Sequence, residues 1–286
     1  EKQNLMTYLD VDTENNYYYS EVKGRELYFV NEGLKVPKYG QVELVEAETS
    51  FTAYQEFQSM LTRDRIDIFM VGEFDDYQVL QALHRFPLEG RQVDLQFSYS
   101  QPYVNVVKEK IEPRQSSQSI LQLGYQFSCQ YGDKDYFALI VFNAMFGEFA
   151  HSALFTTLRE KEGLAYSISS QFDVFTGLLE VYAGIEKSNR NQAMRGISRE
   201  LNYIKLGRFS SSLLNQTKKI IRMNALLSED HALTLVEQRF NKVIFGDKSL
   251  SLENWLDEIE KVTKKDVCRV ARQVKLQSLF FLEGVS

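Results

Sequence analysis

The order of hydrophobic patterns along residues 118–286 constrains the fold more than any other feature of this sequence. Alternating or short continuous apolar runs predict four strands, at 120–127, 164–173, 178–185 and 277–282. Apolar residues spaced three or four apart predict helices at 136–146 and 152–159, and again from 189 to near the end of the sequence. Strands separated by runs of helices are typical of the α+β class. We therefore expect an antiparallel sheet with helices packed on one face.

Residues 1–97 predict only a part of such a domain. Apolar residues at helical spacing predict a helix over 51–61, and the short apolar run 65–71 before Gly72 predicts a buried strand. Asp75, three residues before Gln78, is typical of a helix N-terminus. One strand is too few for a sheet, so we expect the C-terminal part of a first domain, a partial copy of the second.

A linker is expected between the two units. Two of the four prolines, Pro102 and Pro113, fall in a polar stretch. We therefore divide the chain into a partial domain at 1–97, a linker at 98–117 and a complete domain at 118–286. Elsewhere proline is so rare that long uninterrupted helices are expected.

Composition excludes several classes of partner. The net charge is −6, from 33 basic and 39 acidic residues, so neither nucleic acid nor an anionic membrane is an expected ligand. No run of about 18 apolar residues predicts a membrane-spanning helix. The two cysteines, Cys129 and Cys268, cannot make a disulfide framework or a four-cysteine zinc site. We interpret them as buried reduced thiols and expect a cytoplasmic protein.

The residues that could form a catalytic centre are sparse. The three histidines, His84, His151 and His231, are too far apart to share a helix turn, so no His-x-x-Glu-His zinc helix exists. The alternative is a metal site assembled from distant residues; we predict no metal ligand on this chain. Phosphate-binding and serine-nucleophile motifs are also absent. The run Tyr17, Tyr18 and Tyr19 is interpreted as packing residues rather than as a ligand platform.

One segment, residues 154–166, combines a helix end, a charged turn and a strand start. Arg159 and Tyr166 lie seven residues apart across this turn, where both side chains could point into one cleft. A fixed cation and a phenol donor can hold a substrate carbonyl and stabilise the oxyanion of a tetrahedral intermediate. The alternative from the residues alone is a surface arginine and a tyrosine packed at a strand edge.

The same segment carries a family resemblance. A glycine at 147 is followed by Ser-x-Leu-Phe at 152–155 and by Leu-Arg-Glu-Lys-x-Gly-Leu-Ala-Tyr at 158–166. This pattern resembles the second domain of the insulinase or pitrilysin-like zinc metallopeptidases, the M16 family, which includes the mitochondrial processing peptidases. The likeness continues in residues 177, 183–185 and 262–267, while 37–40 and 64–72 resemble the end of a first such domain.

The resemblance implies a fold and two site residues. In this family an active domain binds zinc through His-x-x-Glu-His and a distal glutamate, and a zinc-free domain faces it across a chamber. That zinc-free domain contributes an arginine and a tyrosine, which implies that Arg159 and Tyr166 contact the substrate carbonyl and the oxyanion. The zinc helix would lie in the front half of the first domain, which residues 1–97 do not resemble. We therefore expect no catalytic residue, metal ligand or cofactor on this chain alone.

Three functions remain open on this resemblance. The one we favour is a non-catalytic protein that binds a peptide substrate as a homo- or heterodimer with an M16 protein bearing His-x-x-Glu-His and zinc, as in bacterial two-subunit enzymes. The second is a structural or peptide-binding homologue, similar to the core proteins of a respiratory complex. The third is a complete zinc peptidase whose zinc-binding segment lies ahead of residue 1.

Overall fold

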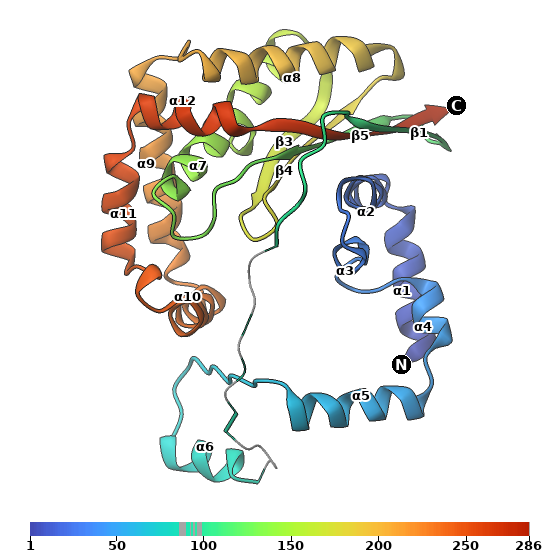
Figure 1. Ribbon diagram of the computed structural model, residues 1–286, viewed down its shortest axis with the longest axis vertical. Coiled ribbons are helices and arrows are strands. Elements are labelled where there is room, and N and C mark those ends of the chain that lie inside the picture. Colours follow the sequence, from blue (N-terminus) through green and yellow to red (C-terminus); the bar gives the residue numbers. More distant parts are fainter. Residues whose placement is uncertain (86–89, 92, 94, 96–98, 286) are drawn as a thin grey trace.

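Figure 1 shows the computed structural model of the protein, which describes residues 1–85, 90, 91, 93, 95 and 99–285. A five-stranded sheet lies at its centre, and helices from both ends of the chain surround it. The boundary predicted between residues 97 and 98 lies outside the described residues.

The sheet has the strand order β1-β5-β2-β4-β3. Its strands are β1 (Lys108–Gln115), β2 (Ser119–Gln126), β3 (Ala165–Asp173), β4 (Leu178–Ile185) and β5 (Lys275–Val285). The four predicted strands pair antiparallel to their neighbours, as expected. The sheet as a whole is mixed, because β1 pairs with β5 in parallel.

Strand β1 lies within residues 98–117, the stretch predicted as a linker, and was not predicted as a strand. Its sequence is polar and largely exposed, which is why hydrophobic patterning does not reveal it. As an edge strand, β1 needs hydrogen bonds on one side only, so Pro113 is tolerated within it.

Helices of the second unit cover one face of the sheet (Figure 1). They are α7 (Tyr136–Asn143), η1 (Ala144–Glu148), η2 (Phe155–Lys161), α8 (Arg190–Lys205), α9 (Ser211–Ser228), α11 (Leu252–Lys261) and α12 (Lys264–Gln273), with α10 (Ala232–Phe245) beyond them. Their apolar residues and one face of β2, β4 and β5 form a single core cluster. Thr263 and Asp266 form the predicted capping box at the start of α12. Within the described residues, no helix is both long enough and apolar enough to cross a membrane.

The opposite face of the sheet is covered too, by a helix of the first unit. Helix α2 (Asn16–Tyr28), from the first unit, packs across β2 and β5 (Figure 1). Close approach requires small residues, because a Cβ on Gly24 would lie 2.6 Å from the Cγ of Gln122. Arg25 of α2 then makes a two-pronged contact with the buried carboxylate of Glu180, with N···O distances of 3.1 and 2.8 Å.

The rest of the first unit consists of helices that extend away from the sheet (Figure 1). They are α1 (Lys2–Glu14), α3 (Glu32–Lys35), α4 (Val42–Ala47), α5 (Ser50–Arg63) and α6 (Asp76–Leu83). The predicted helices at 51–61 and after Asp75 are present, and Asp75 accepts hydrogen bonds from the first turn of α6.

The strand predicted at 65–71 is wrong. These residues form no regular element, and Ile68 and Met70 are 49% and 45% exposed. A strand is stable only when another strand satisfies its backbone groups, and no strand occurs in residues 1–85 of the structure.

Candidate functional site

The turn between η2 and β3 carries the arginine and the tyrosine selected from the sequence. η2 is a π-helical turn, in which the Glu162 amide donates to the Thr157 carbonyl at 2.9 Å. Gly163 then takes a positive φ of 61°, and the chain enters β3. π-Turns are rare and are frequent at functional sites.

Tyr166 lies at a β-bulge. Ala165 pairs with Ile185 and Ser167 pairs with Gly184, so Tyr166 is an extra residue in β3. Ala165 and Ile168, which precede and follow Tyr166 and Ser167 in β3, are buried in the core. Tyr166, which is 50% exposed, and Ser167 therefore both lie outside the core. Bulges of this kind redirect side chains and are common beside active sites.

The hydroxyl of Tyr166 is held by a carboxylate. It donates a hydrogen bond to Oε1 of Glu186, the residue that follows β4, at 2.7 Å. This hydrogen bond raises the pKa of Tyr166 above its ordinary value. A phenol with the ordinary pKa of about 10 is already protonated at neutral pH, and this hydrogen bond keeps Tyr166 protonated to higher pH.

Arg159 is an exposed cation at the end of η2. Its guanidinium carbon lies 4.6 Å from the ring centroid of Phe155, so the side chain rests on an aromatic face. No carboxylate of the described residues forms an ion pair with it, because the nearby Glu162 pairs with Arg199 at 2.6 Å. Arg159 is thus available to an external oxygen ligand.

Arg159 and Tyr166 lie on either side of the same turn, and no hydrogen bond joins their side chains. A cavity of about 860 Å³ lies elsewhere, where the β3–β4 turn meets the loop after β2, and neither residue lines it. That both side chains point into one cleft therefore stays a prediction.

The histidines occupy structural positions. Nε2 of His151 lies 2.9 Å from Oγ1 of Thr217, its ring stacks on Phe149, and burial lowers its pKa. His84 and His231 flank the ends of α6 and α10. Across the described residues, no group of three or more His, Cys, Asp or Glu side chains could hold a metal ion. These residues therefore do not fit a zinc site.

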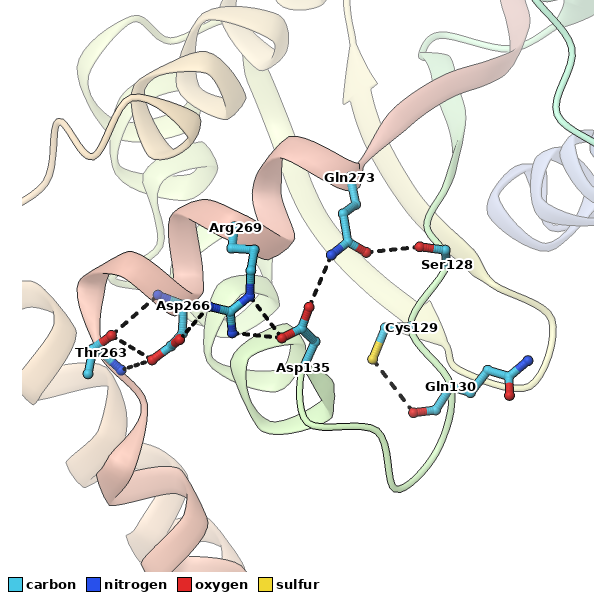
Figure 2. A network of polar contacts seen from close by, with 8 residues as sticks. All are labelled: Ser128, Cys129, Gln130, Asp135, Thr263, Asp266, Arg269 and Gln273. Atoms are coloured by element: carbon cyan, nitrogen blue, oxygen red, sulfur yellow. Dashed lines mark hydrogen bonds and ion pairs between the residues drawn. The ribbon is translucent and has the colours of Figure 1, made fainter.

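A second polar cluster, shown in Figure 2, has a structural role. Asp135 at the start of α7 accepts two hydrogen bonds from Arg269 of α12, at 3.0 and 2.7 Å, and one from Gln273. Gln273 in turn accepts from Ser128, so the loop after β2 is tied to α12. The bonds from Arg269 lower the pKa of Asp135. Burial raises the pKa of the neighbouring Cys129 to about 12, which makes this thiol unreactive.

Sequence reasoning missed the residues that surround Tyr166. Glu186 is 20 residues from Tyr166 in sequence. Tyr17 is 150 residues from Ser167 in sequence, yet the hydroxyls of these two residues lie 2.7 Å apart. The bulge that makes Tyr166 and Ser167 adjacent neighbours outside the core has no pattern in the sequence. The one signal in the sequence was Gly184, because a glycine within a strand often marks the close approach of another group. Only the structure reveals which groups approach it.

Solved structures of other proteins share this architecture. A conserved protein from Enterococcus faecalis matches 99% of the chain and 67% of its own length, with a TM-score of 0.94 and 36% identity. A peptidase M16 inactive domain from Pseudomonas fluorescens matches 100% of the chain and 70% of its own length, with a TM-score of 0.75 and 15% identity. The latter likeness shows the fold alone. The class that these structures define is an α+β domain with an M16-like fold.

Sequence comparison then gives the family. A family model described as the peptidase M16 inactive domain matches residues 54–221. A Bacillus subtilis protein named probable inactive metalloprotease YmfF is 32% identical over 285 residues, which are 99% of this chain and 67% of that protein. The chain belongs to the M16 peptidase family and is a homologue of its inactive domain, which confirms the resemblance. It spans about two thirds or less of the length of the curated relatives that it matches.

Proposed function

We propose that this chain forms the substrate-positioning half of an M16 peptidase chamber and has no catalytic activity by itself. Arg159 and Tyr166 contact the peptide, and a partner domain or subunit with His-x-x-Glu-His supplies the metal centre. One observation carries the proposal: an exposed arginine without a carboxylate partner among the described residues lies in a π-helical turn, and a phenol held by a carboxylate lies at the start of the strand that follows.

The chemistry assigned to this chain is positioning and charge stabilisation. The guanidinium of Arg159 and the hydroxyl of Tyr166 donate hydrogen bonds to the carbonyl oxygen of the bound peptide. As that oxygen gains negative charge during attack, donors already aimed at it stabilise the transition state more than the ground state. The chain's two free, buried cysteines fit a reducing compartment, so we place the protein in the cytoplasm.

Reconstitution with a partner tests this function. The purified chain is mixed with an M16 protein that carries His-x-x-Glu-His, and cleavage of a quenched fluorescent peptide is followed. Loss of one oxyanion donor typically lowers kcat about 10²–10³-fold, so Arg159→Ala and Tyr166→Phe should each cause a loss of this order. The chain alone should remain inactive with added zinc.

Two surface residues of α8 provide matched controls. Arg195 is exposed, and so is Tyr203 at 38%. Arg195→Ala and Tyr203→Phe should therefore leave kcat unchanged. Changes within about twofold for both Arg159→Ala and Tyr166→Phe would contradict the oxyanion role, and would favour the structural or peptide-binding alternative. Cleavage by a longer natural form of the chain without any partner would favour the alternative of a complete zinc peptidase.

A further inference from the structure

The tyrosine run at the start of α2 connects the first unit to the second. Tyr19 donates a hydrogen bond to Glu112 of β1, so it anchors the helix to the sheet edge. The ring of Tyr17 instead packs edge-on against Tyr182 of β4, with ring centroids 5.7 Å apart. The hydroxyl of Tyr17 lies 2.7 Å from the hydroxyl of Ser167. Two hydroxyls from distant parts of the chain thus form a pair directly beside Tyr166.

This hydroxyl pair depends on Gly184, which lies opposite Ser167 in β4. A Cβ at position 184 would lie 2.5 Å from the Tyr17 hydroxyl oxygen and 2.8 Å from the Ser167 hydroxyl oxygen. Any other residue at this position would therefore push the hydroxyl pair away from the sheet. The absence of a side chain is what lets the pair form.

The two hydroxyls of this pair have one more hydrogen than their mutual contact uses. Each hydroxyl carries one hydrogen, and the contact between the two oxygens uses one of them. The second hydrogen is free for an external acceptor, and Tyr17 is 38% exposed, so an acceptor can reach it. Because Ser167 is the next residue after Tyr166 and neither is buried, this donor lies at the same end of β3 as the residue assigned to the substrate.

We propose that the Tyr17–Ser167 pair is a second contact for the backbone of a bound peptide and donates a hydrogen bond to a carbonyl next to the one held by Arg159 and Tyr166. The inference rests on the proposed function, since it assumes that an extended peptide lies across this surface. It also makes the first unit part of the site, because α2 supplies the tyrosine.

Binding of an unfolded polypeptide tests the pair without any partner. The full chain is passed over immobilised β-casein, and the dissociation constant is measured by surface plasmon resonance. The variant with both Tyr17→Phe and Ser167→Ala has no hydroxyl left to donate, so it should bind roughly 3–10-fold more weakly, as expected for the loss of one neutral hydrogen bond. Each single variant keeps one hydroxyl, whose hydrogen is no longer used within the pair, so its affinity should lie between those of the double variant and the unaltered chain. Gly184→Ala should weaken binding as well, although it removes no hydroxyl.

Tyr18→Phe is the matched control, since Tyr18 is a part-buried neighbour on the same helix. It should bind like the unaltered chain, and all variants are compared well below their melting temperatures. Normal affinity in the Tyr17→Phe/Ser167→Ala double variant together with weakened binding in Tyr166→Phe would overturn the role of the pair and leave the proposed function standing. No binding by the unaltered chain, or equal affinity in all variants including Arg159→Ala and Tyr166→Phe, would overturn both.

Discussion

The hydroxyl of Tyr166 can donate a hydrogen bond only while it is protonated, and Glu186 helps to keep it so. The carboxylate accepts the hydroxyl hydrogen at 2.7 Å and thereby raises the pKa of the phenol. A bound peptide carbonyl must compete with Glu186 for that hydrogen or share it. Glu186 thus holds Tyr166 in a donating state before substrate arrives.

Glu186→Gln should lower the pKa of Tyr166 towards its ordinary value of about 10. The charged acceptor that favours the protonated phenol is gone, so ionisation begins at lower pH. The measurement is an alkaline ultraviolet titration in which the curve of the Tyr166→Phe chain is subtracted to isolate this one tyrosine. A midpoint equal to or above that of the unaltered chain would contradict the assignment.

Residues close in sequence could be predicted as a site, and residues close only in space could not. Arg159 and Tyr166 belong to one continuous motif, which made them visible as candidates; their roles stay a prediction. Tyr17, Ser167 and Glu186 come from three separate elements, which only the docking of α2 and the bulge in β3 bring near one another.

At the scale of elements, the spacing of apolar residues predicts the helices and strands that pack on a core. It fails for a strand that is defined by its hydrogen bonds to a neighbouring strand. The predicted strand 178–185 coincides with β4, because its apolar residues pack on both faces of the sheet. Strand β1 was missed because its residues are polar and its hydrogen bonds to β5 alone define it. The run 65–71 is apolar but has no strand beside it among residues 1–85, so pattern alone does not make it a strand.

Removing the arginine that ties α2 to the sheet should destabilise the protein. Glu180 is 5% exposed and also accepts hydrogen bonds from Gln122 and Gln171, so Arg25→Ala would leave a buried carboxylate without its cation. A broken buried pair costs about 3–5 kcal/mol, and we expect about 2–3 kcal/mol because Arg25 itself is partly exposed. Urea unfolding measures the change.

A second substitution separates charge from packing in this pair. Adding Glu180→Gln to Arg25→Ala removes the uncompensated charge and should recover part of the lost stability. Lys23→Ala breaks a pair with Glu26 and a cation–π contact with Tyr19, both within the same helix, and should cost about 1 kcal/mol or less. Equal losses in Lys23→Ala and Arg25→Ala would show that α2 is not held by this ion pair.

Across the whole molecule, apolar side chains are unevenly covered. The sheet has a continuous core on one face and α2 on the other, whereas α5 presents Phe51, Tyr54 and Phe57 at 66%, 60% and 50% exposure. Exposed apolar patches commonly mark interaction surfaces or aggregation risks. The helix was predicted correctly from its apolar stripe, but the described structure leaves these three aromatic side chains at least half exposed.

Phe57→Ser should therefore reduce surface hydrophobicity without loss of stability. Binding of a hydrophobic fluorescent dye should fall, and the free energy of unfolding should change by about 0.5 kcal/mol or less, as for other exposed positions. Phe142→Ser, at a fully buried position in α7, should cost about 3–5 kcal/mol or more. A loss above about 1 kcal/mol in Phe57→Ser would mean that the face of α5 is covered in solution.

Helix α2 also imposes an order of events during synthesis. It docks on β5, the last strand of the sequence, yet it leaves the ribosome about 250 residues before that strand is made. At roughly 5–20 residues per second, α2 waits on the order of 10–50 s for its binding surface. The partners of Tyr19 and Arg25 on β1 and β4 are made earlier, so only the part of the surface that β5 supplies comes last. The nascent chain must therefore carry α2 incompletely docked until translation of β5 completes the surface that receives it.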